Sequence, residues 1–521
     1  MIILLFLLFF LLAVPVQAKY DPRTVQNNRF GIHVADPNDI AATAALLNTN
    51  GGDWGYVTIV IPETDRNAEK WQGIFDQMRR LHLIPLVRLA THVENAAWKV
   101  PTEQSLRDWI DFLTRLNWPT ENQYIILFNE PNHAKEWGDT IDPEGYARIL
   151  AAFARALRDA HEDFFILPAG MDVSARSDSL SLDAAEYLRR MHQAVPDVFT
   201  LLDGWTSHAY PNPAFSGSPY ATGRGTLWSF VWELSLLSGW GIDTDLPVFI
   251  TETGWVHKEG KVFDGKLLSA AQVGENQRIA AQTAWNDPRV VAVTPFVFNY
   301  QDIPFDHFSW KKLGVNEFYE HYVAYQQLPK AAGTPKQRHM FHFAQPLIPP
   351  QLVSGSTYTL EASITNAGQS ILTPQDFKAQ LTVNGGVFQS IFDPLPTLEP
   401  HQEGMVKVHL QTPPAPGTYN VQLSFVHKGE TIEIASFPLE LVPPPSLALD
   451  VQLGWQRTSN SEDVTVLVYD EKDHVLHKFP GLRLEKGTIR AEGLTNIVPG
   501  HTYRIVALVP YYLPRQTIAQ L

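Results

Sequence analysis

Two glutamate residues each close a short apolar run of the sequence, where their carboxyl groups could do chemistry. Glu130 ends the run of residues 125–130, and Glu252 ends the run of residues 248–252. A carboxylate at the end of a buried strand is costly unless it has a partner or a task. Functional groups of an α/β barrel lie at the carboxyl ends of its strands. A facing pair of carboxyl groups there is what cleavage of a glycosidic bond requires.

This chemistry places different demands on the two carboxyl groups. Cleavage of an acetal requires a proton for the leaving oxygen and negative charge beneath an oxocarbenium-like centre. One carboxyl must therefore be protonated while its neighbour is ionised, and their mutual repulsion produces this difference. A separation of about 5 to 5.5 Å implies retention of the anomeric configuration, whereas a gap above about 6.5 Å implies inversion.

Eight short β-rich runs alternate with segments of helical period and would position these groups. The clearest helix starts at Asp142 and Pro143, an N-cap residue followed by proline at the first helical position. Eight β/α alternations with strands that are apolar throughout match a (β/α)8 TIM barrel better than a doubly wound sheet. The expected strands are residues 30–34, 56–61, 84–89, 124–128, 164–169, 205–208, 248–251 and 290–298, and the last helix is drawn from residues 316–328.

The composition changes after the barrel, where the helical period disappears and short alternating strands follow. Turn signals between such strands are typical of an immunoglobulin-like β-sandwich, and three prolines at 443–445 mark a second break. The predicted fold class is α/β, a TIM barrel followed by this sandwich and a smaller C-terminal β domain. The predicted domains are a barrel at 19–330, a linker at 331–344, a sandwich at 345–442 and a small β-sandwich module at 443–521.

Polar residues close or follow the fourth, sixth and seventh expected strands: Asn129-Glu130 at the fourth strand end, His208 and Tyr210 after the sixth strand, and Glu252 at the seventh. On these residues, the chain from 30 to 328 resembles clan A of the retaining glycoside hydrolases. The resemblance implies that Glu130 is the general acid/base, that Glu252 is the nucleophile, and that Asn129 binds the sugar 2-hydroxyl. It also implies that the tyrosine bonds the nucleophile and that the histidine belongs to the site.

Two positions depart from the pattern of the family. The expected arginine at an early strand end is Arg88, on the third strand rather than the second, so either the strand count slips by one or Arg88 has a different role. Many members end the eighth strand with tryptophan, where this chain has residues 298–300, a Phe-Asn-Tyr sequence. Hydrogen bonds from Arg88 and Tyr210 would keep Glu252 charged.

Aromatic residues after strands four, seven and eight are candidate platforms for sugar rings. Trp137, Trp255, Tyr300 and Trp310 lie in these loops, and ordinary packing is the alternative for each. His33 ends the first strand and is either a substrate contact or a core histidine.

The charge and the loop acids limit the possible partners. A formal net charge of -15 without a Lys/Arg cluster argues against nucleic acid and anionic membrane surfaces and favours a neutral or weakly basic ligand. Asp302, Asp306 and His307 match no metal motif, so neither a metal nor a cofactor is predicted. The expected partner is a polysaccharide or oligosaccharide substrate.

Residues 1–18 are predicted to be a signal peptide, with a retained N-terminal anchor as the alternative. The apolar stretch of residues 2–16 is followed by a small-residue pattern typical of a cleavage site, although the charged n-region is missing. We therefore expect a secreted or cell-surface protein, with possible membrane or cell-surface association through this segment. The absence of cysteine means that the fold is stabilised without disulfides.

Three functional hypotheses follow from these observations. The leading one is a retaining glycoside hydrolase that cleaves β-glycosidic bonds in a polysaccharide, with endo action slightly favoured over exo action. The loops at 212–227 and 255–267 could wall a cleft, although loops of this length also cap exo-acting pockets. The second is a non-catalytic glycan-binding or adhesive surface protein on a barrel scaffold. The third is a transglycosylase that uses the same residues and excludes water.

Overall fold

The computed structural model describes residues 19–383, 386–387, 389–454 and 460–521, and the chain forms two compact units. The units are residues 1–338 and 339–521. The predicted signal peptide lies outside the described residues. Within the described part of the chain, each helix lacks the combination of length and apolar character that is needed to span a bilayer.

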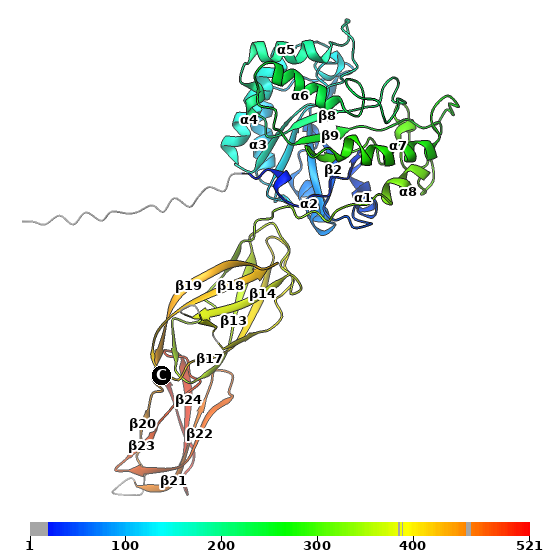
Figure 1. Cartoon of the computed structure of the whole chain (residues 1–521). Helices are drawn as coiled ribbons and strands as arrows, with labels where there is room; N and C mark the ends of the chain where they lie inside the picture. The colour runs from blue at the N-terminus through cyan, green and yellow to red at the C-terminus, as the bar shows by residue number, and fades with distance from the viewer. Residues whose placement is uncertain (1–18, 384–385, 388, 455–459) are drawn as a thin grey trace, which may run out of the picture. The chain divides into compact units, whose positions relative to one another are not determined.

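The first unit contains eight parallel strands that close into a barrel (Figure 1). Five strands pair in the order β1-β2-β3-β6-β7, and three pair in the order β10-β9-β8. A parallel bridge between Phe30 and Val293 joins β1 to β10, and the Thr206 hydroxyl donates to the Pro168 carbonyl across β7 and β8. The strands are β1 (Gly31–Val34), β2 (Gly55–Pro62), β3 (Leu83–Ala90), β6 (Gln123–Leu127), β7 (Phe164–Pro168), β8 (Trp205–His208), β9 (Val248–Glu252) and β10 (Val290–Val293).

Helices follow the barrel strands and surround them, so the prediction of a (β/α)8 barrel is confirmed (Figure 1). Asp142 caps α4 as expected by accepting a hydrogen bond from the Gly145 amide, with Pro143 at the first helical position. α8 starts later than expected, because a bridge between Lys311 and Phe318 holds the preceding segment in a turn. The helices are α1 (Ile40–Leu47), α2 (Ala68–Arg80), α3 (Glu103–Leu113), α4 (Pro143–Ala160), α5 (Ala184–Ala194), α6 (Ser229–Gly239), α7 (Ala270–Gln282) and α8 (Glu320–Gln326).

Alternate strand residues fill the barrel interior and lead up to the functional groups. A buried cluster inside the strands includes Tyr56, Tyr124 and Phe249, and a larger cluster lies between the strands and the helices. On β3 the inward positions Ile84 and Leu86 belong to the interior cluster, and the next position in this series is Arg88. Because the strands are parallel, such series end together at one mouth of the barrel.

β10 is shorter than the sequence predicts. It ends at Val293 rather than reaching residue 298, and the Thr294 hydroxyl donates to the Thr251 carbonyl of β9 instead. Phe298 is buried in the core between strands and helices. Backbone hydrogen bonds still hold residues 294–298 between β1 and the end of β9, because the Phe298 amide donates to the His33 carbonyl and the Phe296 amide donates to the Thr253 carbonyl.

The described residues of the second unit are all β and form three sheets. Two of them, in the orders β11-β13-β17-β16 and β12-β19-β18-β14-β15, share one buried core. The sequence predicts a small sandwich after residue 443, and the described strands there join one six-stranded sheet, β20-β23-β22-β21-β24-β25, with a core of its own. The strands are β11 (Phe341–Phe343), β12 (Gln351–Val353), β13 (Thr357–Asn366), β14 (Phe377–Val383), β15 (Gly386–Val387), β16 (Ser390–Phe392), β17 (Glu403–Gln411), β18 (Gly417–His427), β19 (Glu430–Val442), β20 (Leu447–Asp450), β21 (Ser461–Tyr469), β22 (Val475–Glu485), β23 (Thr488–Ala491), β24 (Thr502–Leu508) and β25 (Arg515–Gln520).

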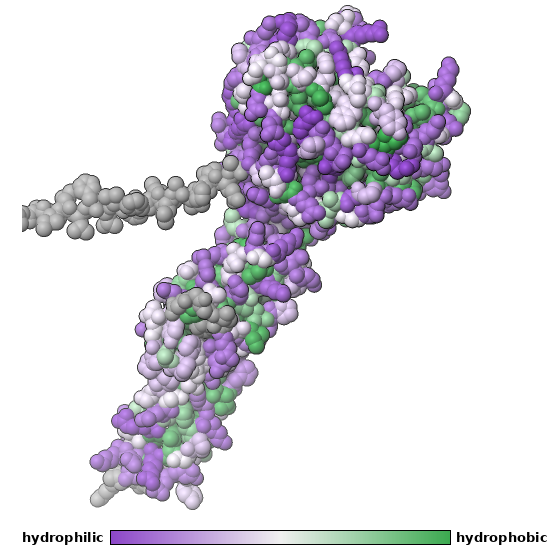
Figure 2. Space-filling view, viewed as in Figure 1, coloured by the Kyte–Doolittle hydropathy of each residue, from purple (hydrophilic) through white to green (hydrophobic). Residues whose placement is uncertain are grey.

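The surface of the barrel unit is mostly hydrophilic on the face drawn in Figure 2, with small hydrophobic areas between the charged residues. Two of the most exposed hydrophobic residues of this unit are Val262 and Phe263, in the long loop after β9. Single exposed apolar side chains are ordinary on soluble proteins. The chemistry of the unit must therefore be sought at the mouth of the barrel.

Candidate active site

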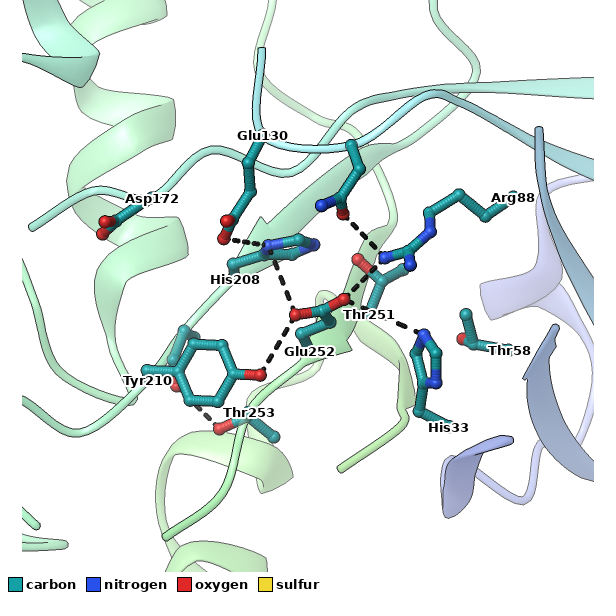
Figure 3. A network of polar contacts seen from close by, with 12 residues as sticks. His33, Thr58, Arg88, Glu130, Asp172, His208, Tyr210, Thr251, Glu252 and Thr253 are labelled. Carbon is teal, nitrogen blue, oxygen red and sulfur yellow. Dashed lines mark hydrogen bonds and ion pairs between the residues drawn. The ribbon is translucent and has the colours of Figure 1, made fainter. Parts of the chain in front are cut away.

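Glu252 lies at the centre of a polar network at the carboxyl end of β9 (Figure 3). Its Oε1 accepts a hydrogen bond of 2.6 Å from the Arg88 guanidinium, and its Oε2 accepts one of 3.0 Å from the Tyr210 hydroxyl. The pairing of β8 with β9 shifts register just before His208, so that His208 lies opposite Glu252. Such irregularities re-aim side chains near functional sites. The network thus holds one carboxyl group by two donors, Arg88 on β3 and Tyr210 after β8.

The surroundings of Glu252 keep its carboxyl ionised. Burial by itself acts to raise the pKa of Glu252, but the positive charges of His208 and Arg88 more than offset it, and the pKa is lowered. His33 Nε2 lies 3.8 Å from Glu252 Oε1, and burial together with the Arg88 charge lowers the pKa of His33 to about 3. His33 is therefore uncharged at neutral pH. Burial raises the pKa of Tyr210, so its hydroxyl remains a donor.

Glu130 approaches Glu252 from the loop that follows β6. Phe128 and Glu130 both have positive φ angles, 76° and 29°, and the Glu130 amide donates to the Gly170 carbonyl at 3.1 Å. A side chain at Gly170 could not fit, because its Cβ would lie 2.2 Å from the His208 ring. Unusual backbone conformations of this kind persist only where the surrounding structure fixes them. The loop therefore presents Glu130 in a defined position beside His208.

His208 connects the two glutamates. Its Nδ1 lies 2.7 Å from Glu130 Oε1 and 3.8 Å from Glu252 Oε2. Burial acts to lower the pKa of His208, but the charges of Glu252 and Glu130 outweigh it, so the pKa is raised. One oxygen of Glu130, one oxygen of Glu252 and one ring nitrogen of His208 all lie within 4.8 Å of one another. Two carboxyl groups from the fourth and seventh strand ends thus meet across a short gap.

Arg88 and Asn129 complete the polar floor of the site. A single guanidinium nitrogen of Arg88 donates to Asn129 Oδ1 and to Glu252 Oε1, each at 2.6 Å. Arg88 lies on β3, the third barrel strand, as the sequence indicates. The count of strands from the sequence therefore does not slip by one, and Arg88 contacts Glu252 from the third strand. Arg88 occupies a different strand from the expected one and still binds the acid of the seventh strand.

A cavity of about 530 Å³ opens above these groups. Its wall includes Arg88, Asn129, Glu130 and Glu252, together with Tyr210. Aromatic side chains form much of the remaining wall, namely Trp98, Phe128, Trp137, Phe215, Phe296, Phe305 and Phe308. A concave site with apolar walls and a few convergent polar groups is typical of a binding site for a small ligand or a segment of a larger one.

The aromatic residues singled out from the sequence fall in different places. Trp137 is buried, packs against Phe128 and contributes to the cavity wall. Trp255 lies instead in the barrel core, where its indole nitrogen donates to the Gly217 carbonyl at 2.9 Å. The ring of Tyr300 packs against Phe305, which lines the cavity. Sugar contacts expected of Trp255 and Tyr300 would therefore have to come from Phe305 and its neighbours.

Two acids of the cavity were not found by sequence reasoning. Glu136 lines the cavity and accepts a hydrogen bond of 3.3 Å from the Asn129 amide. Burial, and then the charge of Glu130, raises the pKa of Glu136 to about 7. Asp172 also lines the cavity and pairs with His133 at 3.0 Å. The position of Glu136 in the sequence could have indicated this role, because Glu136 immediately precedes Trp137, a candidate platform for a sugar ring, in the loop after β6.

The described residues contain one group whose atoms could together hold a metal ion, formed by Glu130, His208 and Glu252. The chemistry of this group does not fit a metal well. Both oxygens of Glu252 already accept hydrogen bonds, from Arg88 and Tyr210, and His208 Nδ1 is bonded to Glu130. A divalent ion would have to bind beside the Arg88 cation. The sequence prediction of a site without metal remains a prediction.

No protein-family model matches the chain, and no curated protein matches it. Among solved structures, the chain is similar to a family 39 glycoside hydrolase from the gut symbiont Bacteroides cellulosilyticus, with 13% identity, 94% of this chain and 82% of that chain covered, and a TM-score of 0.41. It is also similar to a beta-mannanase from Thermomonospora fusca, with 13% identity, 58% and 90% covered, and a TM-score of 0.37. These scores are low, and the description of the fold rests on the strand pairing above.

Proposed function

We propose that the protein is a retaining glycoside hydrolase that cleaves β-glycosidic bonds. The observation that supports this most is the approach of Glu130 and Glu252, whose nearest oxygens lie within 4.8 Å at the base of the cavity. This gap supports the short separation of retaining enzymes over the wider separation of inverting ones. The partners of Glu252 suit the role of a nucleophile, because the charges of His208 and Arg88 keep the Glu252 carboxyl group ionised.

The reaction would proceed in two steps at these residues. In the first, an oxygen of Glu252 forms a bond to the anomeric carbon while the glycosidic bond breaks and Glu130 gives its proton to the leaving oxygen. In the second, Glu130 takes a proton from water, the water oxygen bonds to the anomeric carbon, and the ester to Glu252 breaks. His208 would hold the Glu130 carboxyl in place through the 2.7 Å contact in both steps. As the ester forms, the Glu252 carboxylate would lose its charge and with it the ion pair with Arg88, and its hydrogen bond from Tyr210 would weaken.

The substrate we propose is a polysaccharide, attacked within the chain, by a protein exported to the cell surface or the medium. The apolar segment of residues 2–16 supports export. Phe215 and Phe305, from the long loops after β8 and β10, are partly exposed at the cavity wall, where sugar units beyond the cleaved one could stack. Phe296 and Phe308 would pack against the sugar in the cavity itself.

The experiment that tests this function is product analysis on a panel of β-linked polysaccharides. The wild-type protein and its Glu252→Gln variant are incubated with each substrate, and released oligosaccharides are detected by mass spectrometry. Release by the wild type alone is the expected result. Proton NMR of the first product then gives the anomeric configuration, and we expect retention. An inverted product would contradict the mechanism, and failure to release any product would contradict the function.

The two alternatives have different signatures in the same experiment. A transglycosylase would produce oligosaccharides longer than the starting ones, because a sugar hydroxyl replaces water in the second step. A glycan-binding surface protein would bind a polysaccharide on the panel without cleaving it. The intact set of Asn129, Glu130, Tyr210 and Glu252 supports the hydrolase over the binding protein.

A further inference from the structure

Glu136 differs from the other carboxyl groups that line the cavity. Glu252 is paired with Arg88, Glu130 with His208, and Asp172 with His133. For Glu136 the structure gives one hydrogen bond, from the neutral Asn129 amide, and no ion pair among the described residues. The positive charge of Arg88 acts on Glu136, but Arg88 is already bonded to Glu252. Lys99 also lines the cavity, with an exposed side chain.

The negative charge of the Glu136 carboxylate is not balanced by a bonded cation, and a ligand could supply that cation. Glu136 is half-buried, and burial followed by the charges of Glu130 and Glu252 opposes its ionisation. A carboxylate has about four acceptor sites, and the Asn129 amide uses one of them. A bound cation with N–H donors would therefore be favoured by charge and by hydrogen bonding together.

The place of Glu136 relative to Glu252 indicates which part of a sugar it would meet. One Arg88 nitrogen contacts both Glu252 Oε1 and Asn129 Oδ1, and the Asn129 amide nitrogen contacts Glu136. In the proposed reaction the anomeric carbon bonds to Glu252. The resemblance to clan A implies that Asn129 binds the substituent on the neighbouring ring carbon, C2, which would place this substituent beside Glu136 as well.

We propose that the cavity binds a sugar with a protonated amino group at C2, and that Glu136 is the carboxylate that contacts this group. The substrate class is then a β-linked polymer containing 2-amino-2-deoxy sugars whose amines are not acylated. This inference rests on the proposed function for the position of the ring. It agrees with the acidic charge of the chain, which favours a weakly basic ligand.

The first test measures binding of uncleaved ligands that differ only at C2. Calorimetric titration uses 1-thio-β-glycosides in the gluco, galacto and manno configurations, each with a 2-hydroxyl, a 2-acetamido or a 2-amino group. Binding is compared because a positive group at C2 slows the chemical step and would bias a comparison of rates. We expect Kd for the 2-amino ligand of the accepted configuration to be about 10-fold or more below that of the 2-hydroxyl ligand at pH 7.5.

The second test uses the Glu136→Gln variant, in which the side chain keeps its size and loses its charge. It should weaken binding of the 2-amino ligand about 10- to 100-fold and change binding of the 2-hydroxyl ligand less than about 3-fold. The matched control is Glu162→Gln, an exposed acid in the turn before β7, at the opposite end of the barrel strand. Unchanged binding of the 2-hydroxyl ligand also shows that the variant is folded.

The pH dependence separates a direct contact from a structural role. Because the pKa of Glu136 is about 7, the preference of the wild type for the 2-amino ligand should grow between pH 6 and pH 7.5 and be absent in Glu136→Gln. Glu130, Glu252 and Arg88 also face Glu136, and their charges act on the 2-amino ligand as well. These three groups remain in Glu136→Gln, so only the part of the preference that the variant loses is assigned to Glu136.

Two results would overturn the inference. One is that no 2-amino ligand, in any of the three configurations, binds more tightly than its 2-hydroxyl counterpart. The other is that Glu136→Gln weakens both ligands equally. These readouts need no cleavage, so failure of the proposed function, seen as no product from any polysaccharide, remains a separate result.

Discussion

The chain carries the dipeptide Asn-Glu at two places, and their surroundings give the two glutamates different properties. Glu130, in the loop after β6, lines the cavity and lies 2.7 Å from a ring nitrogen of His208. Glu317, in the loop before α8, is exposed over 69% of its side chain and pairs with Lys312 at 2.9 Å. A surface ion pair of this kind contributes little, because water screens it.

The difference teaches that reactivity depends on what a carboxyl group faces. Water surrounds Glu317, and the Lys312 contact lowers its pKa, as expected for a surface acid. Inside the cavity the same group type shows both directions of shift. The cations beside Glu252 lower its pKa, whereas burial without a bonded cation raises that of Glu136 to about 7. Four substitutions can test this contrast, from the largest expected effect to the smallest.

Replacing Glu252 by glutamine should have the largest effect. The neutral amide cannot form the ester with the anomeric carbon, so kcat should fall about 10⁴-fold or more on the substrate that the panel identifies. Initial rates of product release measure this loss. Tryptophan fluorescence should remain that of the wild type, which shows that the barrel is folded. A residual rate within about 100-fold of the wild type would mean that Glu252 is not the nucleophile.

Replacing Glu130 by glutamine should lower kcat about 10²- to 10⁴-fold on a natural glycoside. The loss should be much smaller on an aryl glycoside with an acidic phenol, because that leaving oxygen needs no proton. Rates on both substrates give the comparison. Glu317→Gln is the matched control, since it makes the same change in the second copy of the dipeptide, and its rates should stay within about twofold of the wild type. Equal losses on both substrates would contradict the role of Glu130 as acid.

Replacing Arg88 by methionine should move the acid limb of the pH profile of kcat/KM. The guanidinium helps to keep the pKa of Glu252 low, so its removal should raise that pKa. Glu252 must be ionised to attack, and the acid limb of kcat/KM should therefore move up by about 1 to 2 pH units. A pH profile from pH 3 to pH 8 measures the shift. A lower rate with an unmoved limb would show that Arg88 only positions its neighbours.

Replacing Glu136 by glutamine should change the pH dependence of stability. The folded-state pKa of Glu136, about 7, lies above the ordinary value of 4.5, so the folded protein binds this proton more tightly than the unfolded chain does. The wild type should therefore lose stability as the pH rises from about 4.5 to about 7, and the glutamine variant should lack this loss. The variant should gain about 1 to 3 kcal/mol relative to the wild type between these limits.

Urea unfolding followed by tryptophan fluorescence checks this prediction, because all but one of the fourteen tryptophans lie in the sequence of the barrel unit. Glu162→Gln serves as the control with an exposed acid. A stability difference between the variant and the wild type that does not depend on pH would show that Glu136 is not selectively protonated in the folded protein.

The contacts of the central site could be anticipated from residue types at strand ends. Arg88 and Tyr210 bond Glu252, as the sequence interpretation expects. The cavity wall could not be anticipated in the same way. Trp255 follows a strand end, yet it is buried in the core, and Glu136 faces the cavity from a loop that carries no regular pattern. Loop side chains are placed by contacts with distant segments, such as those between the loops after β6 and β7.

The sequence by itself determined the eight strands, the alternation of strands and helices, and the order in which the acids follow one another. These features depend on local periodicity and on capping residues, and both can be recognised within a short stretch of the sequence. Only the tertiary structure decided which acids meet, which donors they share and which one lacks a cation. Those relations depend on closure of the barrel and on the register shift beside His208. Each of them joins residues far apart in the sequence, so no local pattern encodes them.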